Sequence, residues 1–145
     1  MDKVKILVVD DESRMRKLVR DFLTRQNYEV LEAADGEEAL DIFYKDKAIA
    51  LLILDVMMPK MNGWEVCREI RQTSKVPIIM LTAKSDESDE LMGFDLGVDE
   101  YITKPFHRKF LWRVSKRFCA GPIRSAMRPI LRRQERLFWI RQHTR

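Results

Sequence analysis

Five residues could do chemistry together, because each follows directly after an apolar run of the sequence. Asp10 and Asp11 follow ILVV, Asp55 follows LLIL, Thr82 follows IIML and Lys104 follows YIT. A buried strand has no use for a charge in its interior, whereas a charge at its end can face a crevice in which ligands bind. The positions of these residues therefore indicate a site built from strand ends.

Residues of these types could bind a metal cation and an incoming anionic group together. Carboxylates gathered within a few ångströms raise one another's pKa unless a cation lies among them. Oxygen ligands without histidine or cysteine favour a hard cation in a water-rich site, which is typical of Mg²⁺. Lys104 adds a second positive charge, so a phosphoryl group could be held by the metal, Lys104, the Thr82 hydroxyl and backbone N–H groups. Asp55 could attack that group and form an acyl phosphate.

Each of these residues also has a purely structural interpretation. Asp10 and Asp11 could cap the helix that follows them, since acids are favoured at helix N-termini. Asp55 could belong to a turn before MMPKMNG, and Thr82 could be a small residue that ends a strand. Lys104 could simply be solvated. The ordered set at the strand ends favours the chemical interpretation, because site geometry outranks any single motif.

Apolar runs and helical patterns alternate along the chain. Strands are predicted at residues 5–9, 28–33, 49–54, 76–81 and 100–103. The spacing of apolar residues predicts helices at 13–26, 35–45, from 62 onward, 85–97 and 107–118. Strands separated by single helices imply right-handed crossovers and a parallel sheet covered on both faces, which is an α/β doubly wound fold. In such a sheet, ligands bind outside the carboxyl ends of the strands.

Four segments carry a resemblance to a known family. ILVVDDE, LLILDVMMPKMNGWEVCREIR, VPIIMLTAK and GVDEYITKPF resemble the receiver domain of bacterial two-component response regulators, over residues 3 to about 106. The sequence is most similar to receivers that precede a winged-helix DNA-binding domain, the OmpR/PhoB type. The resemblance implies a CheY-like, flavodoxin-like (βα)5 sheet with strand order 2-1-3-4-5. It also implies a signalling switch in the control of transcription, not an enzyme.

The resemblance implies roles for the acidic residues. Asp55 would accept a phosphoryl group from a sensor histidine kinase. Asp11 would bind Mg²⁺ directly and Asp10 would help to hold it. Asp55 and the backbone carbonyl of Met57 would complete the protein ligands. Met57 and Lys84 would border the path of the attacking water, so we expect them to set the lifetime of the phosphorylated state.

Other residues would convert phosphorylation into a change of shape. Thr82 and Lys104 would contact the phosphoryl group, and Tyr101 would turn inward behind Thr82. Lys104 and Pro105 would be joined by a cis peptide, which is accessible at low cost only before proline. The output would be a shift in the face made by the fourth helix, the fifth strand and the fifth helix.

Two residues depart from the pattern of this subfamily on that output face. Its receivers form a homodimer held by salt bridges between the fourth and fifth helices. Glu90 stands where a lysine is expected, and Phe110 stands where an acid is expected. These departures argue against the usual symmetric homodimer, or favour a different pairing of Glu90 with an arginine of the fifth helix.

Charge is divided unevenly along the chain. Residues 1–105 carry 22 acidic and 15 basic side chains, whereas residues 106–145 carry one acidic and 12 basic, so the net charge of +4 describes neither part. The expected domains are a receiver over residues 1–118, with an atypical fifth helix, and a basic tail over residues 119–145. The tail is too short for a winged helix, so DNA binding would need a domain that is missing here. It could be helical, disordered, or the truncated or frame-altered end of a longer regulator.

Two other functions stay open. A Mg²⁺-dependent phosphatase of the aspartyl-phosphate type would place an acid two residues after its nucleophile, where this chain has Met57. A nucleic-acid binder would act through the basic tail. No apolar run reaches the length of a membrane span, and the start MDKVKILVVDDE lacks a signal-peptide layout, so we expect a cytoplasmic protein without membrane contact. Cys67 and Cys119 are expected to be reduced.

Overall fold

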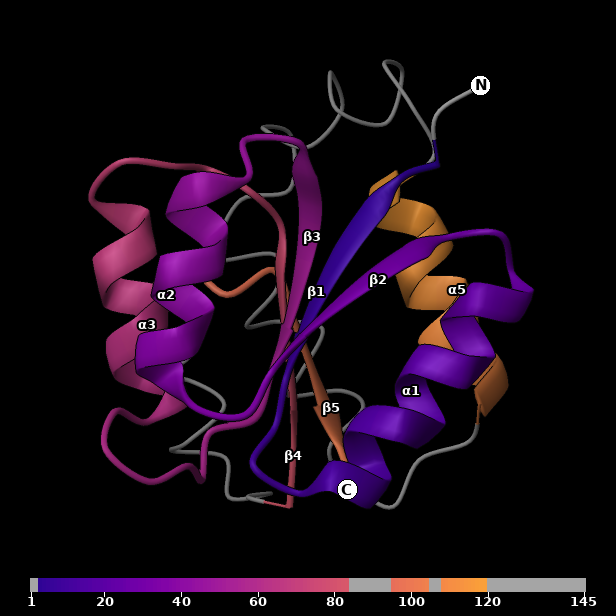
Figure 1. Cartoon of the computed structure of the whole chain (residues 1–145), viewed down its shortest axis with the longest axis horizontal. Coiled ribbons are helices and arrows are strands. Elements are labelled where there is room, and N and C mark those ends of the chain that lie inside the picture. Colours follow the sequence, from indigo (N-terminus) through magenta and orange to yellow (C-terminus); the bar gives the residue numbers. More distant parts are fainter. Residues whose placement is uncertain (1–2, 84–94, 105–107, 120–145) are drawn as a thin grey trace.

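A five-stranded parallel sheet forms the centre of the molecule (Figure 1). The structure is a computed structural model, and it describes residues 3–83, 95–104 and 108–119. The strands are β1 (Lys5–Val9), β2 (Glu29–Ala33), β3 (Ile49–Leu54), β4 (Ile78–Thr82) and β5 (Glu100–Thr103). They pair in parallel in the order β2-β1-β3-β4-β5. The predicted fold class and strand order are therefore confirmed.

Helices cover both faces of this sheet. Those in the described residues are α1 (Ser13–Arg25), α2 (Gly36–Lys45), α3 (Gly63–Arg71) and α5 (Arg108–Cys119). Figure 1 shows α2 and α3 on one side of the sheet and α1 and α5 on the other. The helix predicted at residues 85–97 falls mostly on residues 84–94, which lie outside the described part, so the labels pass from α3 to α5.

Apolar side chains fill the space between the sheet and both helix layers. Leu52, Leu54 and Met80 pack toward α2 and α3. Ile53 and Leu81 pack toward α1 and α5. Successive residues of a strand point to opposite faces, so a strand that is covered on both sides is apolar throughout. This is why short, unbroken apolar runs predicted the central strands correctly.

The two helices that begin beside the site start in different ways. α3 begins with a capping box, in which Asn62 accepts a hydrogen bond from the Glu65 N–H and Glu65 accepts one from the Asn62 N–H. α1 follows Glu12 as its N-cap residue, and Glu12 makes no side-chain capping hydrogen bond. Neither Asp10 nor Asp11 is therefore the N-cap residue of α1, although Asp10 Oδ1 accepts a hydrogen bond from the Glu12 N–H just before the helix begins.

The start of β4 differs from the prediction by two residues. The strand begins at Ile78, not at Val76, and extends to Thr82. Pro77 has no N–H to donate to a ladder, although its carbonyl still accepts a hydrogen bond from the Leu52 N–H at 3.0 Å. Thr82 is therefore the last residue of the strand and not the first residue after it.

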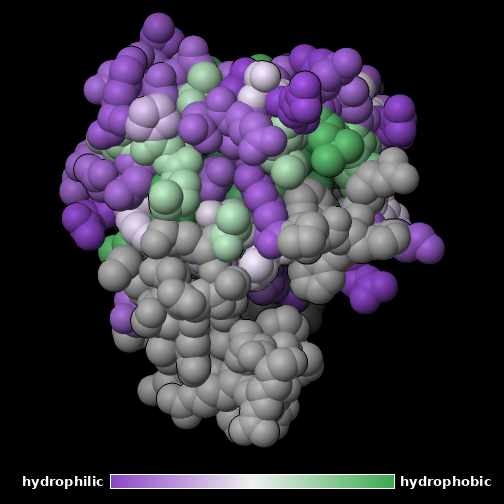
Figure 2. All heavy atoms as spheres, turned by 90° about the horizontal axis from the view of Figure 1, so that it is seen from below, coloured by the Kyte–Doolittle hydropathy of each residue, from purple (hydrophilic) through white to green (hydrophobic). Residues whose placement is uncertain are grey.

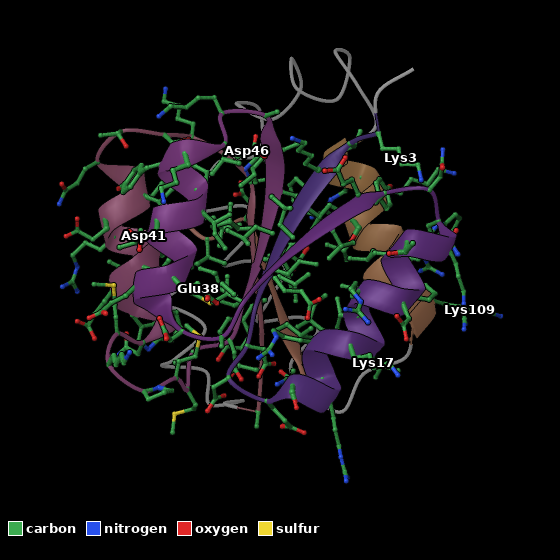
Figure 3. All side chains as sticks on the ribbon, in the orientation of Figure 1. Lys3, Lys17, Glu38, Asp41, Asp46 and Lys109 are labelled. Atoms are coloured by element: carbon green, nitrogen blue, oxygen red, sulfur yellow. The ribbon has the colours of Figure 1, made fainter. Side chains whose placement is uncertain are left out.

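The outer faces of the helices are charged. Figure 3 shows Lys17 on α1 and Lys109 on α5 pointing away from the sheet. Within the described ranges, none of the helices is both long and apolar enough to cross a membrane. Residues 120–145, which carry the predicted basic tail, lie outside the described part of the chain.

Candidate functional site

Three carboxylates meet at the edge where the strands end. One oxygen of each of Asp10, Asp11 and Asp55 lies within 4.8 Å of the other two. Asp10 and Asp11 follow β1 directly, Asp55 follows β3 directly, and these two strands are neighbours in the sheet. Figure 2 looks onto this edge, where hydrophilic groups cover most of the described surface. Parallel pairing thus brings together acids that are far apart in the sequence.

Asp10 is buried, with 3% of its surface exposed, and it is held at several atoms. Its N–H donates to the Ala33 carbonyl at 3.2 Å, and its Oδ1 accepts from the Glu12 N–H at 2.9 Å. Its Oδ2 accepts from the Lys104 ammonium at 2.9 Å. Burial raises the pKa of Asp10 and outweighs the hydrogen bonds from Lys104 and Glu12, which lower it. Burial thus works against the ionised form of Asp10, whereas the Lys104 ammonium beside it favours that form.

Both carboxylate oxygens of Asp55 are engaged. Oδ1 accepts from the Met57 N–H at 3.1 Å, and Oδ2 accepts from the Lys104 ammonium at 3.2 Å. The Asp55 N–H donates to the Val9 carbonyl at 2.9 Å, which ties the end of β3 to the end of β1. The side chain is thus oriented toward Lys104 at the sheet edge.

The start of α3 lies directly against the backbone of Asp55. A Cβ atom on Gly63 would come 2.4 Å from the Asp55 carbonyl oxygen. The Gly63 N–H also donates to the Val56 carbonyl at 3.0 Å. Only glycine allows so close an approach, so Gly63 fixes α3 to the loop that carries Asp55.

Lys104 joins the two sides of the site. Its side-chain ammonium contacts the carboxylates of both Asp10 and Asp55. Its backbone N–H donates a hydrogen bond to the Thr82 carbonyl at 2.8 Å. Burial lowers the pKa of Lys104, but the hydrogen bond to Asp10 and the charges of Asp10 and Asp55 together raise it above its ordinary value. Lys104 is therefore an ammonium at neutral pH.

Asp11 and Met57 are the exposed members of the site. Asp11 is exposed, and Met57 has 56% of its surface exposed. Among the residues that the structure describes, the Asp11 carboxylate makes no hydrogen bond or ion pair. It is the member of the acidic cluster that is most available to a ligand from solvent.

The donor set fits a hard divalent cation. Carboxylate oxygens are the ligands that Mg²⁺ prefers, and two ligands of one octahedral Mg²⁺ lie up to roughly 4.2 Å apart. The separation of at most 4.8 Å among Asp10, Asp11 and Asp55 is close to that value. The cluster is also acidic beyond what Lys104 alone balances, so the residues present fit such an ion.

Thr82 and Tyr101 occupy neighbouring strands behind the acids. Thr82 is buried at the end of β4, and its Cα pairs with that of Thr103 in β5. Tyr101 is 8% exposed, and its ring stacks on that of Trp64 with 6.2 Å between the centroids. The structure therefore shows Tyr101 turned into the protein and not toward solvent.

Four predicted positions lie outside what the structure describes. They are Lys84, Glu90, Pro105 and the side chain of Phe110. Their predicted roles in the phosphoryl lifetime, the cis peptide and the homodimer stay predictions.

Sequence reasoning misses two residues that contact the site. Arg16 donates a hydrogen bond to the Asp10 carbonyl at 2.7 Å, and Trp64 stacks on Tyr101. Helical spacing indicates only a packing role for Trp64, and no sequence pattern points to Arg16. Both contacts join elements that are separate in the sequence, so no local pattern could have revealed them.

Most of the chain matches one known protein family. Residues 6–114 match the response regulator receiver domain. The probable transcriptional regulator ycf27 of Porphyridium aerugineum is 53% identical over 111 residues, which are 77% of this chain and 46% of that protein. The transcriptional regulatory protein ResD of Bacillus subtilis is 50% identical over 109 residues, which are 72% of this chain and 43% of ResD. The chain therefore spans about half the length of these relatives.

Solved structures show the same architecture. The chemotaxis protein CheY4 of Vibrio cholerae aligns with a TM-score of 0.76 and 34% identity, over 81% of this chain and 99% of that one. DrrB, an OmpR/PhoB homolog of Thermotoga maritima, aligns with a TM-score of 0.73 and 38% identity, over 82% of this chain and 54% of DrrB.

Proposed function

This chain belongs to the response regulator receiver family, and we propose that its Asp55 accepts a phosphoryl group that switches the domain. The observation that carries the proposal is the arrangement around Asp55. Asp10 and Asp11 lie beside it, and Lys104 contacts both Asp10 and Asp55. A nucleophile next to acids that fit a cation, with an ammonium beside it, matches the needs of phosphoryl transfer.

The donor in this proposal is the phosphohistidine of a sensor histidine kinase. The P–N bond of the phosphohistidine breaks, a P–O bond to an Asp55 carboxylate oxygen forms, and the imidazole takes up a proton from solvent. The product is an acyl phosphate on Asp55. The Lys104 ammonium lies 3.2 Å from Asp55 Oδ2 in this structure. It would donate hydrogen bonds to the phosphoryl oxygens and stabilise their negative charge.

Asp10, Asp11, Asp55 and the backbone carbonyl of Met57 would hold Mg²⁺. The ion would neutralise the charge that otherwise keeps the carboxylate and the phosphoryl group apart. Asp11 suits direct coordination because its carboxylate is exposed and has no partner among the described residues. Asp10 suits a supporting role because its two oxygens already accept hydrogen bonds from Glu12 and Lys104.

Thr82, Lys104 and Tyr101 would form the switch. The Thr82 hydroxyl and Lys104 would bind the phosphoryl oxygens, and Tyr101 would turn inward behind Thr82. Tyr101 can take up this inward position, since its ring is buried and stacked on Trp64 in this structure. Lys104 and Pro105 would be joined by a cis peptide, and Met57 and Lys84 would set the lifetime of the acyl phosphate.

The output surface in this proposal includes β5 and α5. Arg117 of α5 donates to Glu100 of β5 at 2.7 Å, so these two elements are joined by an ion pair within one chain. Control of transcription would be the outcome, because the relatives ycf27 and ResD are named as transcriptional regulators, and this chain matches slightly less than half of each. A homodimer through the face that includes β5 and α5 is not part of the proposal, because Glu90 and Phe110 depart from the pattern that such a dimer uses.

The aspartyl-phosphatase alternative gains no support. Its mechanism needs an acid two residues after the nucleophile, and Met57 at that position offers an apolar, solvent-exposed side chain. The alternative of a nucleic-acid binder depends on the basic tail at residues 119–145, of which 120–145 lie outside the described residues.

The proposal is tested by the intact mass of the protein after incubation with acetyl phosphate, with and without Mg²⁺. One added phosphoryl group is expected in the presence of Mg²⁺, and none is expected in Asp55→Asn. The uptake of phosphoryl by Asp55→Asn at the wild-type rate would refute Asp55 as the acceptor.

A further inference from the structure

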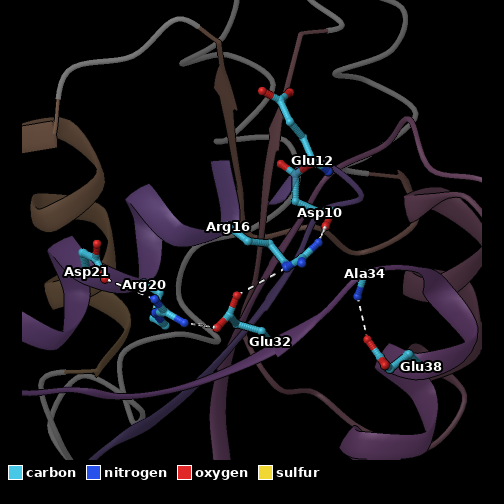
Figure 4. Close-up of polar contacts among 8 residues, drawn as sticks. All are labelled: Asp10, Glu12, Arg16, Arg20, Asp21, Glu32, Ala34 and Glu38. Carbon is cyan, nitrogen blue, oxygen red and sulfur yellow. Dashed lines mark hydrogen bonds and ion pairs between the residues drawn. The ribbon is translucent and has the colours of Figure 1, made fainter. Parts of the chain in front are cut away.

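Arg16, on the first turns of α1, reaches back to the strand end that carries the acids. Its Nη1 donates to the Asp10 carbonyl at 2.7 Å, and its Nε donates to Glu32 Oε1 of β2 at 3.3 Å (Figure 4). The Arg16 side chain has 19% of its surface exposed and that of Glu32 has 29%. One guanidinium thus joins α1, β2 and the end of β1.

The carbonyl that Arg16 holds belongs to the peptide between Asp10 and Asp11. A peptide group is planar, so fixing its carbonyl also fixes the direction of the N–H and Cα of the next residue. The Asp11 carboxylate has no hydrogen bond or ion pair of its own among the described residues. The backbone determines the direction of the Asp11 Cα–Cβ bond, and with it which side-chain rotamers reach the cluster. The contact from Arg16 is one of the restraints on that backbone.

The Glu32 carboxylate accepts hydrogen bonds from two arginines of α1, Arg16 and Arg20. Glu32 Oε2 accepts from Arg20 Nη1 at 2.7 Å, while Oε1 accepts from Arg16. Arg16 and Arg20 are four residues apart on α1, where two like charges repel. Arg20 also lies 3.5 Å from Asp21, but no contact of Arg20 with Asp10 is present. The two arginines therefore share a partner, and only Arg16 reaches the site.

We propose that Arg16, oriented by Glu32, is a positioning residue for the cation site: it fixes the peptide between Asp10 and Asp11 so that the Asp11 carboxylate points into the acidic cluster. This inference rests on the proposed function, because it takes the cluster of Asp10, Asp11 and Asp55 to bind Mg²⁺. Residues that orient metal ligands without touching the metal typically change its affinity about 10- to 100-fold when they are replaced.

The test is a titration of Mg²⁺ into the full chain, followed by the backbone amide resonances of the site. Arg16→Gln is expected to weaken Mg²⁺ binding about tenfold. Glu32→Gln is expected to weaken it less, because Arg16 keeps its contact with Asp10. Arg20→Gln is the matched control. It removes an ion pair with the same partner, Glu32, from the same face of α1, but Arg20 does not contact the Asp10 carbonyl. It should bind Mg²⁺ like the wild type.

The free energy of unfolding of each variant, measured by denaturant without Mg²⁺, separates positioning from folding. Equal loss of stability in Arg16→Gln and Arg20→Gln, with weaker Mg²⁺ binding in Arg16→Gln alone, supports the proposal. Wild-type affinity in Arg16→Gln, or equal weakening in Arg20→Gln, overturns it while leaving the proposed metal site intact. Failure of the wild type itself to bind Mg²⁺ would instead refute the metal site, and this inference with it.

Discussion

The indole ring of Trp64 stacks on the phenol ring of Tyr101, with centroids 6.2 Å apart and planes inclined by 22°. Trp64 is the second residue of α3, directly after Gly63, which lies against the backbone of Asp55. Tyr101 belongs to β5 on the far side of β4. The stack therefore connects the loop of the proposed phosphoacceptor with a strand of the proposed output surface.

The stack predicts an energetic coupling between Trp64 and Tyr101. Aromatic pairs of this kind contribute about 0.5–1.5 kcal/mol beyond the area that they bury. In a double-mutant cycle with Trp64→Ala and Tyr101→Ala, we expect the free energies of unfolding to be non-additive by about that amount. Trp64→Ala with Tyr28→Ala is the control, because Tyr28 packs with the cluster on the other face of the sheet. Additive effects for Trp64 and Tyr101 would contradict the coupling.

Removal of the Lys104 ammonium should make the protein depend on metal for its stability. Lys104→Met leaves the carboxylates of Asp10 and Asp55 without their shared cation. The loss of one partner from a buried ion pair costs about 3–5 kcal/mol, and the partial exposure of this site places the expected cost at the lower end. Mg²⁺ should therefore raise the Tm of Lys104→Met more than that of the wild type.

Lys17→Met is the matched control for this experiment. Lys17 is exposed on α1 and points away from the sheet. Its replacement should leave both the Tm and the response to Mg²⁺ unchanged. If Mg²⁺ stabilised Lys104→Met and the wild type equally, Lys104 and the metal would not share the same carboxylates.

Cys67 predicts a specific dependence on pH. Burial raises the pKa of the Cys67 thiol to about 11, from 9.0. Because the unfolded chain loses this proton first, the thiol contributes stability that is complete below pH 9 and declines as the pH rises toward 11. In the Cys119→Ser background, stability should fall more steeply over this window with Cys67 present than in Cys67→Ala. Parallel curves would show that the thiol is not buried as described.

The lifetime of the phosphorylated state should depend on Met57 and Lys84. Met57 is exposed beside Asp55, and an amide at this position could orient a water molecule toward the phosphorus atom. Met57→Asn is expected to speed the loss of phosphoryl, and Lys84→Ala is expected to change its rate. Both rates can be followed by intact mass after removal of the phosphodonor. Unchanged rates in both variants would exclude these residues from the path of water.

The sheet can be predicted from the sequence because burial on both faces leaves a strong signal. A strand such as β3, with IALLIL, can only be placed inside a covered sheet. The order of elements then determines which residues share the carboxyl edge, so the sequence alone is enough to group Asp10, Asp11 and Asp55. The predicted start of β4 is two residues too early, because Val76 and Pro77 continue the apolar run without joining the strand.

The supporting contacts cannot be predicted in this way. Arg16 contacts Asp10 and Glu32 only because of the way α1 packs against β1 and β2. Trp64 contacts Tyr101 only because of the way α3 packs beside β5. Such contacts depend on how distant elements fit together. Hydrophobic period and turn residues carry no information about them.

In the proposed function Asp55, and no other carboxylate of the cluster, carries the phosphoryl group. The most direct measurement is reduction of the phosphorylated protein with borohydride, which converts an aspartyl phosphate to homoserine, followed by peptide sequencing by mass spectrometry. Homoserine is expected at position 55, with Asp10 and Asp11 unchanged. Homoserine at position 10 or 11, with Asp55 intact, would show that another carboxylate of the cluster is the phosphoacceptor.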